Sequence, residues 1–279
     1  EHLTGQIEVL LTRQLEDDNW EALVHPGRKI RTGERLYFGD GELEAEVISR
    51  GEFGLRRLHF QSRGGVPLPE LLERLGHVPL PPYITRPDEA SDRERYQTIF
   101  ASRPGAVAAP TAALHFTPEN RDAICRKGAE ICELTLYLGL GTFQPIRSPT
   151  LEAHRMHGEA YDIPAETAER LQAARKVGRP ILAVGTSVVR ALEDAALRAE
   201  RLQREVLVAA GSAEAQIFIT PGLRFRVVDV LLTNFHLPRS TLLALVCAFA
   251  GREQVLAAYR HAVEAGYRFY SYGDCMLIR

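Results

Sequence analysis

The segment TNFHLPRST, residues 233–241, places an amide, an imidazole and hydroxyl groups directly after an apolar run. Residues 227–232 have the pattern of a buried strand, and from Ser240 the apolar spacing becomes helical. Ligands of open α/β sheets bind at such strand-to-helix corners, where a histidine beside an amide can position a proton. A single histidine there is more often structural, so His236 and Asn234 could form either a site or a packed corner.

Four other predicted strand ends lead into similar residues. Paired glycines allow a backbone to approach a ligand closely, and a serine that caps a helix can lie beside a bound carboxylate or phosphate. A plain turn or a plain cap explains each pattern about as well. These candidates are Thr111 and His115, Gly141 and Thr142, Gly185, Thr186 and the expected cap Ser187, and Pro221 and Gly222.

The segment HRMHGE carries His154, His157 and Glu159, a combination that raises the question of a metal site. Its spacing lacks the i, i+4 histidine pair that binds zinc from one helical face. We therefore favour a hydrogen-bonding or acid–base role for the three residues and expect no metal.

The tail YRFYSYGDC surrounds Asp274 with aromatic residues. Aromatic rings at this density can stack on bases, although alternating aromatic residues in a terminal strand more often belong to a core. A carboxylate after a glycine could fix a cation or a base edge, so Asp274 is a further candidate.

Strands that alternate with helices must position these residues. This alternation predicts an α/β fold, a catalytic domain over 63–279 with a mostly parallel or mixed sheet. Five short strands within residues 5–60, with no helical segment between them, predict a small antiparallel β-barrel or meander as a separate domain, 1–62. The expected strands of the large domain are 105–110, 132–138, 180–186, 215–220 and 227–235, and its helices are 119–127, 165–176, 187–198, 241–249 and 253–265.

The composition excludes several classes of protein. A formal charge of −2 over 279 residues argues against a surface coated in positive charge and confines any nucleic-acid contact to a patch. The four cysteines form no CxxC pair, which is typical of a reducing compartment. The longest apolar stretch, 242–250, is shorter than the roughly 20 residues of a membrane span, and no signal peptide is visible. We expect a cytoplasmic protein, and a segment preceding Glu1.

Eight segments, in this order, resemble the S-adenosylmethionine:tRNA ribosyltransferase-isomerase family of queuosine biosynthesis. They cover most of the chain from residue 79 to its end. The segments are PLPPYI (79–84), DRERYQTIFA (92–101), PGAVAAPTAALHF (104–116), LTLYLGLGTFQPI (134–146), HRMHGEAY (154–161), AVGTSVVRALE (183–193), TNFHLPRSTLLALVCAFAG (233–251) and YRFYSYGDCMLI (267–278).

The resemblance implies an enzyme that moves the ribosyl group of S-adenosylmethionine onto 7-aminomethyl-7-deazaguanine at the wobble position of tRNA. The product would be epoxyqueuosine, with adenine and methionine released. S-Adenosylmethionine would be a substrate, and no metal or membrane is implied. The family usually carries a histidine where this chain has Tyr137.

The same resemblance turns the candidate residues into a hypothesis about the site. Proton transfer would fall to four histidines, with His236 and His115 favoured because each follows a strand end, and Arg190 and Arg239 would contact phosphate or the methionine carboxylate. The catalytic set is His115, His236, His154, His157 and Glu159. The donor-binding set is Thr111, Gly141, Thr142, Gly185, Thr186, Ser187, Arg190, Pro221, Gly222, Asn234, Arg239 and Asp274.

Two alternatives remain open from the sequence. One is a metal-dependent hydrolase that uses His154, His157 and Glu159. The other is a tRNA-binding protein without catalysis, a relative that lacks the family's N-terminal segment. Whichever function applies, we expect a monomer.

Overall fold

The computed structural model describes residues 5–139, 146, 148–151, 153, 154, 156 and 158–279, and its contacts divide them into two compact units. The first unit holds residues 5–80 together with Gly105–Val107. The second holds Pro81–Pro104 and Ala108–Arg279. Each unit is described by itself below.

The first unit is a five-stranded antiparallel sheet with one helix. Its strands are β1 (Glu8–Gln14), β2 (Asn19–His25), β3 (Arg35–Phe38), β4 (Leu43–Arg50) and β5 (Leu55–Ser62), joined in part by the 3-10 turns η1 (Gly27–Lys29), η2 (Gly39–Gly41) and η3 (Glu52–Gly54). The sheet order is β1-β2-β5-β4-β3. Five antiparallel strands are thus confirmed, but among the described residues β1 and β3 are edges and the expected closed barrel is not formed.

Helix α1 (Leu68–Leu75) packs on this sheet through an apolar face. Its Leu68 and Leu71 are buried in the same core as Val47 and Leu58. Burying side chains of this size stabilises a fold by roughly 1.5–3 kcal/mol each. The helix therefore belongs with the first unit, and the domain boundary predicted after residue 62 stays a prediction.

The second unit contains two small sheets. One is antiparallel, with β6 (Thr135–Tyr137), β7 (Glu159–Ile163) and β9 (Gly211–Ala215) in the order β6-β7-β9. The other is mixed, in the order β11-β10-β8, with β10 (Val230–Asn234) parallel to β8 (Leu182–Val184) and antiparallel to β11 (Cys275–Ile278). The predicted α/β class is confirmed in its mixed form, since β8 and β10 are the only parallel pair among the described strands.

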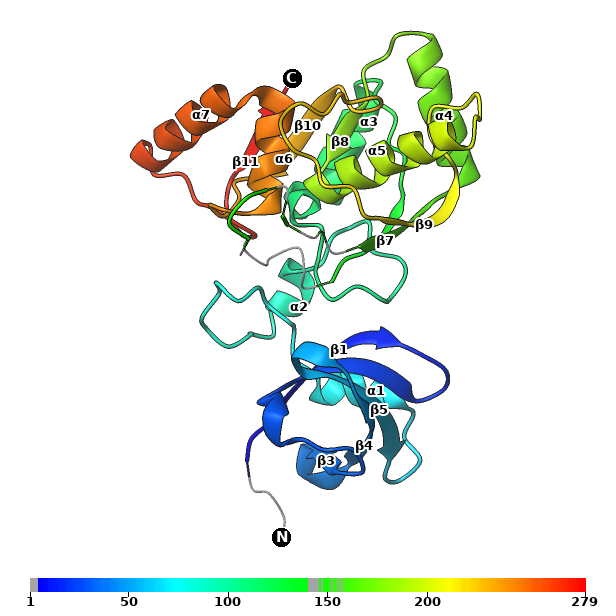
Figure 1. The fold of residues 1–279 in the computed structure, drawn as a ribbon, viewed down its shortest axis with the longest axis vertical. Coiled ribbons are helices and arrows are strands. Elements are labelled where there is room, and N and C mark those ends of the chain that lie inside the picture. The colour runs from blue at the N-terminus through cyan, green and yellow to red at the C-terminus, as the bar shows by residue number, and fades with distance from the viewer. Residues whose placement is uncertain (1–4, 140–145, 147, 152, 155, 157) are drawn as a thin grey trace. The chain divides into compact units, whose positions relative to one another are not determined.

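The helices follow the predicted ranges to within a few residues. They are α3 (Pro118–Arg126), α4 (Ala165–Lys176), α5 (Thr186–Arg201), α6 (Thr241–Ala250) and α7 (Arg252–Glu264), with the short α2 (Asp92–Arg95) and the 3-10 helix η4 (Thr111–His115) in addition. Figure 1 shows α5 next to β8, with α4 beyond it, and α6 and α7 near β10 and β11.

Two predicted strands, 105–110 and 215–220, do not form. Pro110 leads the first segment into η4. In the second, the Arg190 guanidinium donates to the carbonyl oxygens of Ala215 and Ile217, so a side chain occupies acceptors that a continuing strand would offer to a neighbour. Local apolar alternation does not reveal such competition for backbone groups.

Helix α5 lies at the centre of the second core. Val189 and Leu192 pack there with Tyr161, Leu231 and Leu245 from the strands and from α6. Several other buried positions of α5 are alanine, which lets neighbouring elements approach the helix closely. The helix thereby holds the ends of β8 and β10 in fixed positions.

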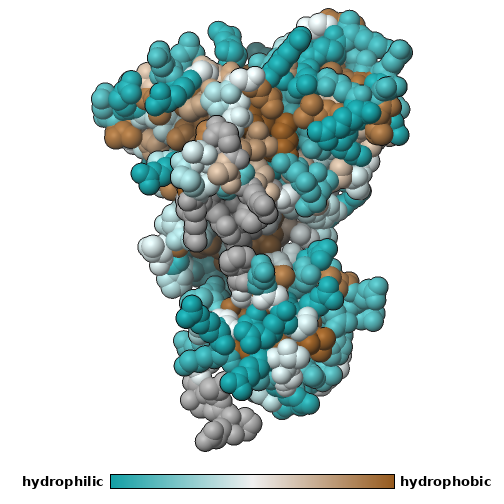
Figure 2. Space-filling model, in the orientation of Figure 1, coloured by the Kyte–Doolittle hydropathy of each residue, from teal (hydrophilic) through white to brown (hydrophobic). Residues whose placement is uncertain are grey.

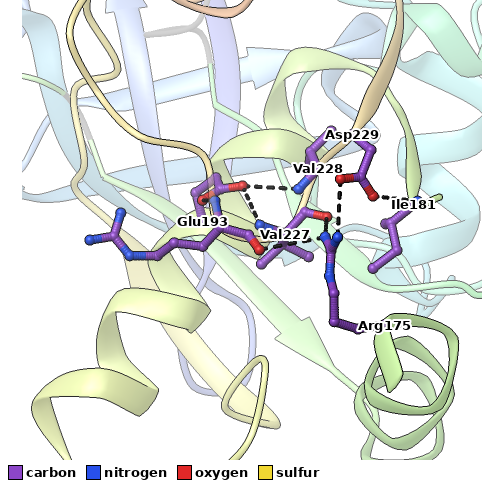
Figure 3. Close-up of polar contacts among 7 residues, drawn as sticks. Arg175, Ile181, Glu193, Val227, Val228 and Asp229 are labelled. Carbon is purple, nitrogen blue, oxygen red and sulfur yellow. Dashed lines mark hydrogen bonds and ion pairs between the residues drawn. The ribbon is translucent and has the colours of Figure 1, made fainter. Parts of the chain in front are cut away.

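Two carboxylates, the buried Glu193 and the exposed Asp229, fix the segment that enters β10 (Figure 3). Glu193 of α5, 0% exposed, accepts hydrogen bonds from the backbone N–H groups of Arg226, Val227 and Val228 at 2.8–3.1 Å. Asp229 accepts from the Ile181 N–H at 2.8 Å and from the Arg175 guanidinium at 3.1 Å. These bonds satisfy buried donors that the loop cannot satisfy within itself.

The visible face of each unit is largely hydrophilic, with hydrophobic residues exposed in places (Figure 2). In the described part of the chain, no single helix is long and apolar enough to cross a membrane, although α6 and α7 reach that length together with a bend of 115° between them.

Candidate functional site

A pocket in the second unit forms where the ends of β8 and β10 meet η4. Its empty volume is about 430 Å³, including space open to solvent. Six of the predicted site residues line it: Thr111, Gly185, Thr186, Ser187, Asn234 and His236. The other described lining residues are Ala108, Ala109, Pro110, Ala112, Leu138, Val184, Val188, Thr233 and Leu242.

Asn234, the last residue of β10, is 1% exposed and makes two hydrogen bonds through one atom. Its Nδ2 donates to the carbonyl oxygen of Tyr270 at 3.1 Å and lies 3.2 Å from Nε2 of His115. Because a carbonyl oxygen can only accept, the Tyr270 contact assigns the amide orientation. The buried Oδ1 of Asn234 then has no hydrogen-bond partner among the described residues.

The same contact fixes the protonation of His115. With the amide nitrogen donating, Nε2 of His115 accepts, and the proton of the neutral ring is on Nδ1. Burial lowers the pKa of His115, and the charge of Asp274 opposes this shift. His115 does not itself line the pocket, but Asn234 connects its ring to one wall.

His236 faces the pocket from the other side of the β10 end. Its Nε2 lies 2.8 Å from the Thr233 hydroxyl, and its backbone N–H donates to the hydroxyl of Tyr259 at 2.8 Å. Burial lowers its pKa to about 4, so the ring is neutral at pH 7. With Nε2 engaged by Thr233, Nδ1 is the nitrogen left for proton transfer.

The N-terminus of α5 opens onto the same pocket. The helix begins at Thr186 after Gly185, which has φ +101° and provides no side-chain cap. The prediction that Ser187 caps this helix is therefore wrong, because Ser187 lies inside the first turn. The first N–H groups of a helix have no partner within it and attract electron-rich ligand atoms.

Arg190 and Glu159 lie away from the pocket lining. Arg190 is 2% exposed, and its Nη1 lies 2.7 Å from Oε1 of Glu159. The guanidinium also donates to two strand carbonyls, as described above. This buried pair joins α5 to β7. Its role in the structure differs from the ligand contact that was expected for Arg190.

The remaining described candidates are also outside the pocket lining. His154 packs edge-on against Phe218 at 5.4 Å between ring centroids. Arg239 is exposed and has φ +56°, and Gly222 has φ +104° in the exposed turn that it forms with Pro221. Asp274 accepts from the Arg268 N–H at 2.7 Å and closes the loop before β11. Gly141, Thr142 and His157 lie outside the described residues.

Among the described residues, no group of three histidine, cysteine, aspartate or glutamate side chains could hold a metal ion. Since His157 is not among them, this finding concerns only the rest of the proposed cluster. Within that rest, Oε1 of Glu159 lies 2.7 Å from Nη1 of Arg190.

Comparison with known proteins identifies the family of the chain. The family model described as queuosine biosynthesis protein matches residues 1–278. The chain belongs to the queuosine biosynthesis protein family.

Individual members of the queuosine biosynthesis protein family are similar to the chain over almost its whole length. The S-adenosylmethionine:tRNA ribosyltransferase-isomerase of Solibacter usitatus is 53% identical, over 100% of this chain and 75% of that protein. The enzyme of the same name from Sorangium cellulosum is 55% identical, over 99% and 78%. The crystal structure of an S-adenosylmethionine tRNA ribosyltransferase from Thermotoga maritima is 36% identical, covers 98% of this chain and 75% of that one, and has a TM-score of 0.48.

Sequence reasoning missed a polar network in this family member that involves Ser271 and Tyr272, the two residues after Tyr270. Asp92 is fully buried and accepts hydrogen bonds from Arg86 at 2.6 and 2.9 Å and from the Tyr272 hydroxyl at 2.9 Å. Ser271, beside Tyr272, is hydrogen-bonded to Tyr83. The Arg86 guanidinium holds the pKa of the Asp92 carboxyl well below its usual range.

This network fixes the turn that presents the Tyr270 carbonyl to Asn234. Tyr270 has φ +72°, an uncommon conformation for a residue with a side chain, and its N–H donates to the carbonyl oxygen of Phe235 at 3.0 Å. The signal in the sequence was the tyrosine-rich tail, for which a core role was the more frequent expectation. The buried aspartate in DRERYQT has no local signal, since its partner Tyr272 is 180 residues away.

Proposed function

We propose that this chain is an S-adenosylmethionine:tRNA ribosyltransferase-isomerase and that the pocket at the ends of β8 and β10 is its donor site. The similarity supports the enzyme assignment, because relatives with this name are 53% and 55% identical across the chain. The composition of the pocket supports its assignment as the donor site, because six predicted site residues from three separate segments line it.

The substrates follow from the enzyme's name and from the family resemblance. S-Adenosylmethionine supplies the ribosyl group, and a tRNA with 7-aminomethyl-7-deazaguanine at the wobble position receives it. Adenine and methionine leave, and epoxyqueuosine is formed. A cytoplasmic location and a monomeric state remain predictions.

The positive sulfonium of the donor makes the neighbouring C5′ protons acidic, so a neutral imidazole nearby can remove one. His236 has the position for this step, since it lines the pocket and Nδ1 remains when Nε2 contacts Thr233. Loss of the proton starts opening of the ribose ring and expulsion of adenine, after which the amine of the tRNA base attacks the sugar. General-base catalysis of this kind contributes typically 10²–10⁴-fold to a rate.

His115 has a different role in this proposal. Its Nε2 accepts from Asn234, so the neutral ring can offer a proton from Nδ1 but no free lone pair at Nε2. We assign it to positioning of the Asn234 amide rather than to removal of the C5′ proton. The two histidines thus have different roles, and only His236 lines the pocket.

Metal-dependent hydrolysis has less support. Its proposed ligand Glu159 is within 2.7 Å of the Arg190 guanidinium, in a buried pair that a metal ion would have to break. A tRNA-binding role without catalysis has no specific observation in its favour.

Release of adenine tests the proposed function. The protein is mixed with S-adenosylmethionine and a tRNA that carries the aminomethyl-deazaguanine base, and free adenine is quantified by chromatography. We expect adenine in proportion to the modified tRNA, and none when the tRNA carries guanine at the wobble position. Full occupancy of both substrates without adenine release would contradict the proposal.

A further inference from the structure

We infer that one end of the first unit binds the phosphate backbone of the tRNA through exposed cations of η1 and of the adjoining ends of β4 and β5. This inference rests on the proposed function, which makes tRNA the nucleic acid concerned, and it gives the first unit a role of its own. We call this surface the cationic end. It consists of the exposed Arg28, Lys29, Arg31, Arg50 and Arg57, and of the buried Arg56.

The cations of the first unit divide into two groups. The unit contains ten arginine or lysine residues and thirteen aspartate or glutamate residues, so a basic composition does not explain a cationic surface. Four of the ten are ion-paired, namely Arg13, Arg35, Arg63 and Arg74. The other six form no ion pair with a carboxylate that the structure describes, and these six make up the cationic end.

Close packing of η1 against η3 brings these residues together from two segments of the chain. A side chain on Gly27 of η1 would place its Cβ only 3.2 Å from Cα of Gly54 in η3, so a glycine is needed for this approach. In the sheet, Arg50 of β4 is directly opposite Arg56 of β5. Like charges in such cross-strand positions repel each other, which an anion bound between the strand ends would relieve.

The buried member of the group, Arg56, holds η1 in place. It is 2% exposed, and its guanidinium donates to the carbonyl oxygens of Leu55 at 2.7 Å, of Ile30 at 3.3 Å and of Gly27. Burial, and then the charge of Arg50, lower the pKa of Arg56. Because arginine stays charged in proteins, this end keeps a buried positive charge that an anion bound at Arg50 would stabilise.

The carboxylates of the same segments do not neutralise this surface. Residues 25–34 and 50–57 contain the six cations and two acidic residues, Glu34 and Glu52. Glu34 accepts a hydrogen bond from the backbone N–H of Arg31 at 3.0 Å rather than pairing with its guanidinium. Six cations against two carboxylates leave an excess of four positive charges.

A strand of phosphates matches this arrangement better than a single small anion. One anion at an exposed arginine gains little in water. A polyanion that contacts several cations at once releases several counterions, which is the main source of nucleic-acid affinity. Guanidinium groups bind phosphate oxygens in pairs, and such contacts position a nucleic acid without reading its sequence.

The salt dependence of tRNA binding tests the inference without the reaction. A fluorescent tRNA with guanine at the wobble position is titrated with the full chain between about 50 and 200 mM salt, and anisotropy gives the dissociation constant. The variant Arg28→Gln with Arg50→Gln removes one cation from each segment. At about 100 mM salt its dissociation constant should rise at least about 10-fold, and the slope of log Kd against log salt should fall by about 1–2, since each phosphate contact contributes about 0.7–0.9.

Two further measurements sharpen this test. Lys29→Gln with Arg31→Gln should weaken binding in the same direction, so the result does not depend on one pair of substitutions. A tRNA of different sequence should lose affinity by the same factor, because phosphate contacts carry no sequence information. A loss confined to one tRNA sequence would overturn the assignment to phosphates.

A matched control removes two ion-paired arginines from the same unit. Arg35→Gln with Arg74→Gln changes the net charge of the chain equally, and Glu44 keeps its contact with Arg63. This control should keep the wild-type dissociation constant to within about 2-fold, because exposed ion pairs contribute little. Equal weakening in control and variant would indicate a general charge effect and overturn the inference, as would an unchanged dissociation constant of Arg28→Gln with Arg50→Gln.

The inference and the proposed function fail in different ways. In adenine release, Arg28→Gln with Arg50→Gln should raise KM for the modified tRNA about 10-fold or more and keep the wild-type kcat, because neither residue belongs to the described lining of the pocket. A lower kcat at unchanged KM would overturn the inference. Weaker tRNA binding by this variant, together with no adenine release by the wild type, would overturn the function and leave the tRNA surface standing.

Discussion

The two halves of helix α5 treat buried polar groups in opposite ways. Beyond its first turn, Arg190 is bonded to Glu159 and to two carbonyls, and Glu193 holds three backbone N–H groups. At its N-terminal end, Gly185 leaves helix donors uncapped, and the nearby Asn234 has an unpartnered oxygen. Within α5, polar side chains beyond the first turn are thus engaged by the chain itself, whereas the first N–H groups of the helix have no side-chain cap.

The largest effect is expected from a substitution in the part of α5 beyond its first turn. Glu193→Ala leaves three buried backbone donors without an acceptor and should lower the free energy of unfolding by about 3–5 kcal/mol. Urea denaturation followed by circular dichroism measures this. Glu193→Gln keeps one acceptor oxygen and should lose less. A loss below about 1 kcal/mol for the alanine variant would show that the loop finds other partners.

Substitutions at the pocket should change the activity more than the stability of the protein. His236→Ala removes the proposed base and should slow single-turnover adenine release by about 100-fold or more. Thr233→Val keeps the imidazole but removes its hydroxyl partner and should have a smaller effect of the same sign. Unchanged adenine release in the alanine variant would end the catalytic assignment of His236.

The neutral state of His236 predicts a pH effect on stability. Burial lowers the pKa of this residue in the fold to about 4, below the ordinary value near 6.5 of the unfolded chain. Between pH 6.5 and 4 the unfolded state therefore binds more protons, so stability falls as pH falls, by about 2 kcal/mol from this residue. The difference between wild type and His236→Gln in urea denaturation across this range isolates the effect, and parallel curves would contradict it.

The smallest expected effect compares two helix N-termini. Ser240→Ala removes the cap of α6 and should lower stability by about 1 kcal/mol while adenine release persists. The α5 end has no such side chain to lose, because its cap is glycine. A large loss of activity in Ser240→Ala, at unchanged stability, would mean that α6 is closer to the chemistry than its hydrogen bonds indicate.

Much of the fold was predictable where the signal is local. Residues 165–176 were expected as a helix and form α4, and the helical spacing expected from Ser240 onward forms α6, which begins at Thr241. Strand pairing was less predictable, because alternating strands and helices do not fix the direction of each neighbour. A mostly parallel or mixed sheet was expected, and among the described strands only β8 and β10 pair in parallel.

In the candidate site, too, only the residues with a local sequence signal could be predicted. Asn234 and His236 were identified because a strand end and a helix start are visible in one short segment. Arg190 was interpreted as a ligand contact because its partner Glu159 lies 31 positions earlier, beyond any local pattern. The contribution of Tyr270 is a backbone carbonyl, and no residue type encodes it.

The Asn234 amide also sets when the pocket can be completed during synthesis of the protein. Its two acceptors come from residue 115 and from residue 270. A nascent chain that already contains His115, His236 and all of α5 still lacks the carbonyl that orients this amide. The amide therefore takes its observed orientation only after residue 270 has been synthesised.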